Sequence, residues 1–257
     1  IGVRLVGSEM CIRDRCNIVG NRLLDVLNTS LVNGVCPEEW KSSVVVPVPK
    51  VYNTKRHDQF RPINTVEVYE KVLELVVKKQ LQNHCDINNI LVPCQSGFRE
   101  RHSCESVVVN VCDTFISSID KNKFILATFL DMRRAFETVD RSILLQKLNN
   151  YGIKGTVFDW FRSYLTNRKQ KVKISNAVSD PLRVNYGVPQ GTVLGPLLFL
   201  IYVNDIVNTV QHCQIELFAD DTMIYIIGTN LKQMEKQMNS DLAVSYTHLT
   251  LPTTSRV

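Results

Sequence analysis

Two mostly apolar runs flank a pair of adjacent aspartates, and this feature constrains the fold more than any other in the sequence. Ile215–Ala219 and Met223–Ile227 are separated by Asp220, Asp221 and Thr222. Short apolar runs joined by a few turn-forming residues predict a β-hairpin. The predicted hairpin carries its acidic residues at the tip.

A third aspartate follows a run of seven uncharged residues further upstream. Phe124–Leu130, FILATFL, predicts a buried β-strand that ends at Asp131. An ionised carboxylate placed against apolar strands is costly to bury unless a positive group joins it. If the two strands are neighbours in one sheet, Asp131 and Asp220 face the same point, where an oxygen-binding cation such as Mg²⁺ fits. A single aspartate in a turn or at a strand end is more often structural, so the combination carries this prediction.

Apolar residues at helical spacing predict four amphipathic helices with defined inner faces. These faces comprise Val19, Leu23, Leu27 and Leu31; Val68, Val72, Leu75 and Val76; Val108, Val111, Cys112, Phe115 and Ile119; and Val157, Trp160, Phe161, Tyr164 and Leu165. Asn64, with Glu67 three residues later, is predicted to cap the second helix, and Ser103 the third. Further helices are predicted over 142–150, from Pro196 to about Val210, and over 230–242.

Two further segments have the pattern of strands. Ser43–Val48 is rich in β-branched residues, and its prolines place it at a sheet edge or strand end. Gln170–Ser175 alternates apolar and basic residues, which predicts a half-buried strand. The polar segment Lys50–Arg61 is predicted to be a loop or a hairpin. Mixed strands and helices with a central hairpin favour an α+β layer architecture.

Composition excludes several classes of protein. The chain has 257 residues, of which 44% are hydrophobic and 21% charged, as in ordinary globular domains. Its longest near-apolar run, 193–203, is too short for a membrane span, which needs about 20 residues. The eight cysteines form no CxxC pair, which argues against a zinc site. Without a secretory signal, reduced thiols in an intracellular protein are expected.

Basic residues gather in two stretches, although the net charge is only +5. Residues 41–61 hold five lysines and arginines against one aspartate, and residues 154–173 hold six against one. Such stretches fit a polyanionic partner, while a solvated basic face is their commoner meaning.

Five ordered motifs closely resemble those of reverse transcriptases, and of non-LTR (LINE-type) retrotransposons in particular. They are VPVPK (46–50) with QFRPINTVEVYEKVLE (59–74), QSGFRERHSCESVVVNV (95–111), FLDMRRAFETVD (129–140), YGVPQGTVLGPLLFLIYVND (186–205) and FADD (218–221). The resemblance implies the fingers–palm part of a right-hand polymerase, with an antiparallel palm sheet packed on helices. It implies fingers over 17–120 with interleaved palm elements, and a palm over 121–243.

The resemblance also implies an activity and its site residues. The activity is extension of a DNA primer on an RNA template with dNTPs and two Mg²⁺ ions, with Mn²⁺ as a substitute. Asp131, Asp220 and Asp221 are the implied catalytic residues, and they bind the metals together with the backbone carbonyl of Met132. The implied nucleotide-binding residues are Lys50, Arg61, Arg134, Ala135, Phe136, Gln190 and Gly191. Phe136 is the aromatic gate that excludes a ribose 2′-hydroxyl.

The sequence departs from the family pattern at both ends. Residues 6–15 and 244–254 resemble translated library adapters, so we expect 1–16 and 244–257 to lie outside the natural domain. By comparison with the family pattern, we expect this chain to lack a thumb and the lysine-bearing motif that follows the acidic hairpin, and to lack an endonuclease before the fingers. A catalytically silent remnant that only binds nucleic acid is therefore the alternative, and an RNA-dependent RNA polymerase is a third. The family implies a cytoplasmic ribonucleoprotein and the nucleus, and protein partners are unknown.

Overall fold

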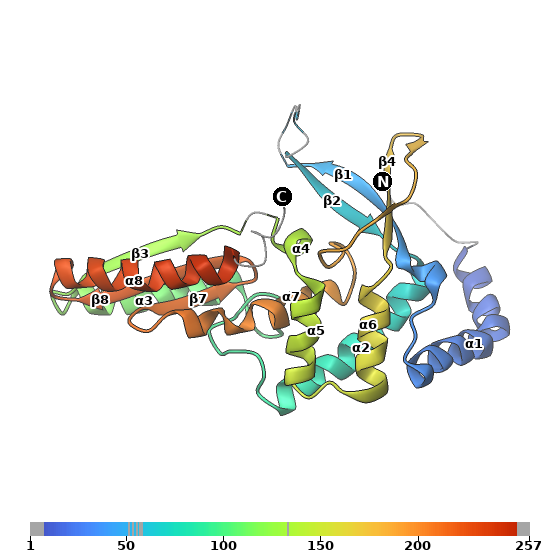
Figure 1. The fold of residues 1–257 in the computed structure, drawn as a ribbon, viewed down its shortest axis with the longest axis horizontal. Coiled ribbons are helices and arrows are strands. Elements are labelled where there is room, and N and C mark those ends of the chain that lie inside the picture. The colour runs from blue at the N-terminus through green and yellow to red at the C-terminus, as the bar shows by residue number, and fades with distance from the viewer. Residues whose placement is uncertain are drawn as a thin grey trace.

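The computed structural model describes residues 8–50, 52, 54, 56, 59–132 and 134–250. Two β-sheets occupy different parts of the molecule, and a group of helices lies between them (Figure 1). Among the described residues, no helix is both long and apolar enough to cross a membrane. The expectation of a mixed architecture of helices and sheets is confirmed.

The first sheet has five strands: β1 (Ser42–Pro49), β2 (Phe60–Thr65), β4 (Lys169–Ile174), β5 (Ala177–Val178) and β6 (Leu182–Arg183). Its order is β2-β1-β4-β5, and β6 also pairs with β4. β1 runs antiparallel to β2 and parallel to β4, so segments far apart in sequence form one sheet.

The predicted strands of this sheet are confirmed, with two corrections. β2 was not predicted, because its sequence FRPINT is polar and contains a proline. Pro47 pairs with Pro62 beyond the region where β1 meets β4, so neither proline interrupts a central ladder. In β4 the apolar alternation does not mark a buried face, since Val172 and Ile174 are exposed.

The second sheet consists of β3 (Phe124–Leu130), β7 (Gln214–Phe218) and β8 (Asp221–Gly228). All pairs are antiparallel, and the order is β3-β8-β7. The predicted hairpin is thereby confirmed. The prediction that Phe124–Leu130 is buried is wrong, because β3 is an edge strand and Phe129 is 78% exposed.

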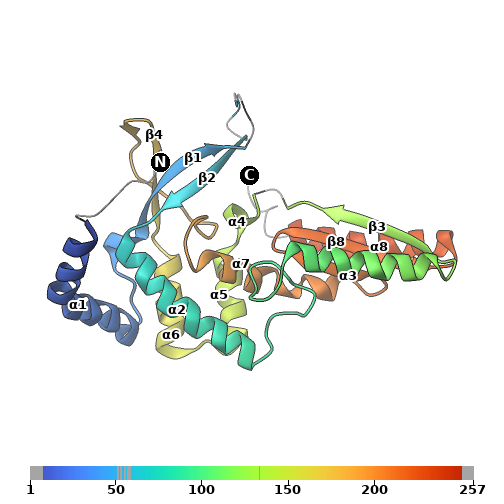
Figure 2. The same ribbon diagram turned by 180° about the vertical axis from the view of Figure 1, so that it is seen from behind.

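Helices cover both faces of the second sheet. Ile224 and Ile226 of β8 pack with Met234 and Met238 of α8 (Leu231–Thr250). Tyr225, which points to the opposite face, contacts Phe115 of α3 (Cys104–Ile119). Figure 1 shows α8 in front of the sheet, and Figure 2 shows α3 in front from behind.

α3 begins as predicted, but its predicted inner face is wrong in part. Ser103 caps the helix by accepting a hydrogen bond from the Ser106 amide (3.2 Å). Phe115 and Val111 are half-buried, whereas the other three predicted inner residues are exposed: Val108, Cys112 and Ile119. α3 covers a sheet of only three strands, so much of its surface remains in solvent.

The central helices are α2 (Val68–Ile87), α5 (Arg141–Asn150), α6 (Gly155–Leu165) and α7 (Gly195–Val203). The larger hydrophobic core lies among them. On α6 the predicted face is confirmed except for Val157, which is 54% exposed. α7 is followed by a 3₁₀ helix over Asn204–Thr209, close to the predicted end at Val210.

The predicted inner face of α2 is wrong except at Val72, and the predicted cap is wrong. Val72 is half-buried against the core, whereas Val68, Leu75 and Val76 are exposed. The buried face instead carries Leu73 and Val77 with two glutamates, Glu70 and Glu74. Asn64 lies in β2 and does not cap the helix. Its Oδ1 instead accepts hydrogen bonds from Ser43 Oγ (2.9 Å) and Gln170 Nε2 (2.8 Å).

The terminal helices are longer than predicted. α1 spans Ser8–Asn33 and packs against α6, with Leu27 buried. The side chain of Val19 and residues 6, 7 and 251–254 lie outside the described part of the chain. At the other end, Ser245 is fully buried and shares a hydrogen bond with Thr209 (2.6 Å), although the sequence assigned it to an adapter-like string. The described residues also include two short helices, Glu38–Lys41 and α4 (Ala135–Thr138).

Candidate active site

The three predicted catalytic aspartates lie at one end of the second sheet. The register pairs Leu130 with Thr222, so Asp131 follows β3 beside Asp221 at the start of β8. Asp220 occupies the turn of the hairpin and is half-buried. Desolvation raises the pKa of Asp220, and the negative charges of Asp221 and Asp131 raise it further. The negative charges of the three carboxylates therefore repel one another, and a bound cation would relieve this repulsion.

The donor set is suited to a hard cation. Three carboxylates and the Met132 carbonyl offer only oxygen ligands, which Mg²⁺ and Mn²⁺ prefer. Within the part of the chain that the structure describes, however, no three His, Cys, Asp or Glu side chains converge tightly enough to hold a metal ion. The fold thus brings the aspartates to one place without closing them into a finished cluster.

Phe136 lies just beyond the first aspartate, on α4. Arg134 adopts a left-handed conformation (φ 54°) and turns the chain from the end of β3 into this helix. The Phe136 ring stacks on Phe199 of α7 with 4.6 Å between ring centroids, and meets Phe98 edge-on at 6.1 Å. Two aromatic neighbours fix the ring in place, while Ala135 beside it is buried.

The loop before α7 carries Gln190 and Gly191 and docks on β2. The Gln190 carbonyl accepts a hydrogen bond from the Asn64 amide (2.7 Å). Gly191 has φ +106°, and a Cβ there would lie 2.7 Å from the Asn64 carbonyl oxygen. Only glycine fits this position without displacing the loop or β2.

The same loop is tied to the segment of Phe136. The Val188 amide donates to the Phe136 carbonyl (2.8 Å), and the Gly187 amide donates to the Val139 carbonyl (2.7 Å). The loop therefore connects β2 of the first sheet with Phe136, which lies near the aspartates of the second sheet. A rigid connection of this kind fixes the spacing between the two halves of the site.

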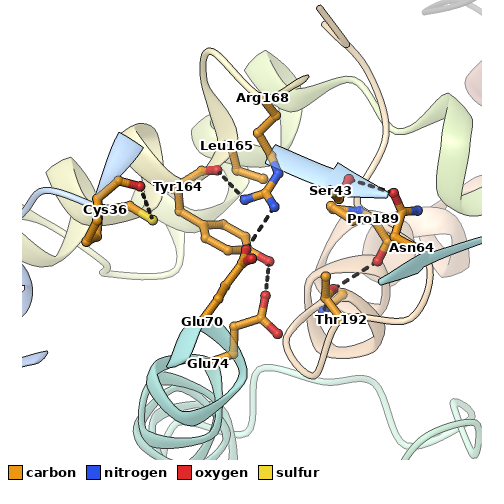
Figure 3. A network of polar contacts seen from close by, with 12 residues as sticks. Cys36, Ser43, Asn64, Glu70, Glu74, Tyr164, Leu165, Arg168, Pro189 and Thr192 are labelled. Carbon is orange, nitrogen blue, oxygen red and sulfur yellow. Dashed lines mark hydrogen bonds and ion pairs between the residues drawn. The ribbon is translucent and has the colours of Figure 1, made fainter. Parts of the chain in front are cut away.

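A buried polar network supports this loop from below (Figure 3). Glu74 Oε2 accepts from the Val193 amide (2.7 Å), and Glu74 Oε1 accepts from the Tyr164 hydroxyl (2.5 Å). Next to it, Arg168 Nη2 donates to Glu70 Oε1 (2.8 Å), and both side chains are 2% exposed. Burial raises the pKa of Glu70 to about 7, against the opposing charge of Arg168. These contacts explain why the buried face of α2 carries two glutamates among its apolar residues.

Arg141 fixes the entry to the loop. Its guanidinium donates hydrogen bonds to four carbonyl oxygens, those of Gly187, Leu165, Val184 and Tyr186. The side chain is buried, and desolvation lowers its pKa to about 10. Sequence reasoning missed this residue, since an arginine one position after a helix cap has no distinguishing pattern.

Lys50 and Arg61 lie on the β1–β2 hairpin of the first sheet, and both are exposed. The Lys50 amide donates to the Gln59 carbonyl (2.8 Å), and Arg61 pairs with Val48. Burial raises the pKa of Glu137, and the charges of Arg134 and, after it, Lys50 oppose that rise, so Lys50 is within electrostatic reach of α4. The structure thus connects Lys50 with the Phe136 helix, while Arg61 remains on the surface of β2.

One residue of the first basic stretch, Arg61, shares a face of the first sheet with lysines of the second stretch. Lys169, Lys171 and Lys173 alternate along β4 and share one of its faces. Lys171 pairs with Val44, which lies on the same side of β1 as Val48, the partner of Arg61. This face, together with the acidic hairpin, is an arrangement suited to an enzyme that transfers phosphoryl groups along a nucleic acid.

Comparison with known proteins gives the family. A model described as "Reverse transcriptase (RNA-dependent DNA polymerase)" matches residues 50–245. The chain belongs to this family. The resemblance to polymerases of non-LTR retrotransposons is therefore confirmed, and so is the coarse expectation of a polymerase palm-and-fingers fold.

Individual relatives come from insect mobile elements. The chain is 29% identical over 171 residues to a probable RNA-directed DNA polymerase from transposon BS of Drosophila melanogaster, which covers 66% of this chain and 19% of the relative. It is 25% identical over 207 residues to the RNA-directed DNA polymerase from mobile element jockey of the same species, covering 77% and 22%. A Pol polyprotein from the R2 element of Popillia japonica is 24% identical over 185 residues, covering 70% and 25%. The chain spans about a fifth of the length of the first two of these relatives.

Proposed function

We propose that this chain is the fingers–palm part of an RNA-directed DNA polymerase from a non-LTR retroelement. It would extend a DNA primer on an RNA template with dNTPs. The observation that carries the proposal is the position of Asp131 beside the Asp220–Asp221 hairpin in the second sheet. The lysines along β4 of the first sheet support it. Family membership supports the RNA template and the nucleotide substrates.

Asp131, Asp220 and the Met132 carbonyl would hold two Mg²⁺ ions, with Asp221 completing the acidic group. When bound, the ions would activate the primer 3′-hydroxyl and neutralise charge on the leaving pyrophosphate. The chain's own contribution is positioning, since the β3–β8 register sets the separation of Asp131 from Asp221. Burial and the neighbouring charges of Asp221 and Asp131 raise the pKa of Asp220, which supports the proposal because an added positive charge would stabilise its ionised form.

The nucleotide would lie between α4 and the β1–β2 hairpin. Lys50 and Arg61 would contact its triphosphate, and the amides of Arg134 and Ala135 would lie nearby. Phe136, held by Phe199, would exclude a ribose 2′-hydroxyl. Gln190 and Gly191, bonded to β2 through Asn64, would meet the base pair that forms. In this proposal the five-stranded sheet belongs to the fingers and the three-stranded sheet to the palm.

One observation favours a second function, binding of nucleic acid without catalysis. Across the described residues the aspartates do not form a three-ligand metal cluster. A chain with this geometry and the basic face of β4 would bind an RNA–DNA hybrid in a salt-sensitive way. It would not incorporate nucleotides.

Primer extension by the 257-residue chain on poly(rA) primed with oligo(dT) distinguishes the two functions. The polymerase proposal predicts incorporation of dTTP that is lost in the double variant Asp220→Asn, Asp221→Asn. Activity that survives both substitutions would refute the site. Hybrid binding without any incorporation by the parent would support the second function. Efficient use of ribonucleotides would instead point to an RNA-dependent RNA polymerase.

A further inference from the structure

A single buried side chain, Gln95, holds the tip of the acidic hairpin. The Ala219 amide donates a hydrogen bond to Gln95 Oε1 (2.9 Å), and Gln95 Nε2 donates to the Ala219 carbonyl (3.4 Å). The side chain amide thus bonds both polar backbone groups of one residue. Gln95 is 2% exposed, so water does not compete for these bonds.

The backbone around Gln95 is attached to the hairpin as well. The Leu217 amide donates to the Cys94 carbonyl (2.9 Å), and the Ser96 amide donates to the Leu217 carbonyl (2.8 Å). Gln95 forms a parallel bridge with Leu217 and so extends the sheet beside β7. The backbone on both sides of Gln95 is therefore hydrogen-bonded to β7, in addition to the bonds that its side chain makes with the turn.

The turn that Gln95 holds is strained. Ala219 and Asp220 form the two-residue connection between Phe218 and Asp221, and Ala219 has φ +59°. This left-handed conformation is unfavourable for a residue with a Cβ, and turns of this kind usually place glycine there. An alanine therefore needs outside contacts to stay in this conformation.

Gly97 provides the room for the contact. A Cβ at residue 97 would lie 2.1 Å from the Ala219 amide nitrogen and 2.7 Å from its Cα. The Gly97 amide also donates to Gln95 Oε1 (2.8 Å), which orients the side chain amide toward the turn. The close approach of Gly97 to Ala219 and the two hydrogen bonds accepted by Gln95 Oε1 together fix the position of this segment against the turn.

We propose that Gln95 is a positioning residue for the acidic pair: it fixes the Ala219 turn, and the turn aims Asp220 and Asp221 at Asp131. The inference rests on the proposed function, because it concerns the same metal site. Ala219 and Asp220 share a peptide unit, so the bond to the Ala219 carbonyl fixes the plane from which the Asp220 side chain departs. Loss of Gln95 would leave the hairpin paired but its tip free to change conformation.

The test uses the 257-residue chain and three variants: Gln95→Met, Ala219→Gly and the double variant. Methionine keeps the length of glutamine without its hydrogen bonds, and glycine adopts φ +59° without strain. Mn²⁺ binding followed by electron paramagnetic resonance reports on the aspartates without requiring catalysis. Primer extension then gives the Mg²⁺ concentration for half-maximal activity and the KM for primer–template.

The expected results form a pattern that a general loss of stability would not give. Gln95→Met weakens Mn²⁺ binding and raises the half-maximal Mg²⁺ concentration, each by at least about tenfold, because it removes a pair of buried bonds. The KM for primer–template changes less than twofold. Adding Ala219→Gly restores most of the lost Mn²⁺ affinity. Gln233→Met, an exposed control on α8, changes neither quantity.

Two results would overturn the inference. One is unchanged Mn²⁺ affinity in Gln95→Met, and the other is a loss that Ala219→Gly leaves unrepaired in a variant with a parental circular dichroism spectrum. A parent that binds Mn²⁺ but does not extend primers would refute only the proposed polymerase activity, since the rescue experiment still decides the role of Gln95. A parent that binds no Mn²⁺ would refute both.

Discussion

Replacement of Arg141 by methionine should destabilise the folded chain by about 5 kcal/mol. The guanidinium donates to four carbonyl oxygens, and each bond from a charged donor contributes about 2 kcal/mol. Removing the buried cation also removes its desolvation cost. Burial and, after it, the charge of Arg168 lower its pKa from 12.5 to about 10, which corresponds to a net penalty of about 3 kcal/mol on the charged form. The difference between these two contributions gives the expected loss.

Urea denaturation followed by circular dichroism measures this loss. Arg141→Lys keeps the charge but lacks the planar group that reaches four carbonyls, so it should destabilise by an intermediate amount. Arg162→Met is the matched control, because Arg162 is 60% exposed and forms an ion pair with Asp159 one turn away. We expect the control to lose less than about 0.5 kcal/mol. A loss below about 1 kcal/mol for Arg141→Met would refute the reasoning.

Three other predictions follow from the site. Phe136→Val should increase ribonucleotide use relative to deoxynucleotide use at least about tenfold in single-nucleotide incorporation, and an unchanged ratio would contradict the gate. Because burial raises the pKa of Glu70 from 4.5 to about 7, the folded state holds a proton that the unfolded state releases between these values. The free energy of unfolding should therefore fall as pH rises through this window. Glu70→Gln should reduce this dependence on pH, as measured by denaturation at several pH values. The same dependence in the parent and the variant would rule out Glu70 as the cause. Gly191→Ala places a Cβ 2.7 Å from the Asn64 carbonyl and should lower the melting temperature by several degrees, and an unchanged melting temperature would show that the loop yields easily.

The hairpin and its aspartates could be predicted because their signals are local. Two short apolar runs around an acidic turn define β7 and β8 without reference to the rest of the chain. The end of β3 before Asp131 is likewise predicted by the seven uncharged residues that precede this aspartate. What the sequence did not show is that β3 lies at a sheet edge, since an apolar strand has the same pattern whether one or two neighbours cover it.

The errors share a physical cause, contacts between residues far apart in the chain. The inner face of α2 was misassigned because Glu70 bonds Arg168, 98 residues away, and Glu74 bonds the amide of Val193, 119 residues away. Hydrophobic periodicity cannot anticipate a buried pair of this kind. The result is a helix that exposes Val68 and Val76 while it buries Glu70 and Glu74.

Gln95 and Gly97 were missed for the same reason. Both lie in the motif QSGFRERHS, in which the sequence pattern predicts only a helix cap at Ser103 and no role for Gln95 or Gly97. Gln95 reaches Ala219 across 124 positions. The one local signal is Gly97 itself, because glycine is the residue that permits a close approach of two backbones.

The most direct test of the account is single-nucleotide incorporation on an RNA template with Mg²⁺, comparing the parent chain with Asp131→Asn. Asp113→Asn on the exposed surface of α3 serves as the matched control. The account predicts that the parent and the control incorporate dNTP, and that Asp131→Asn loses activity at least about a hundredfold, as expected when a metal ligand is neutralised. Incorporation by Asp131→Asn at the parental rate would contradict the central claim that this aspartate and the acidic hairpin form one site.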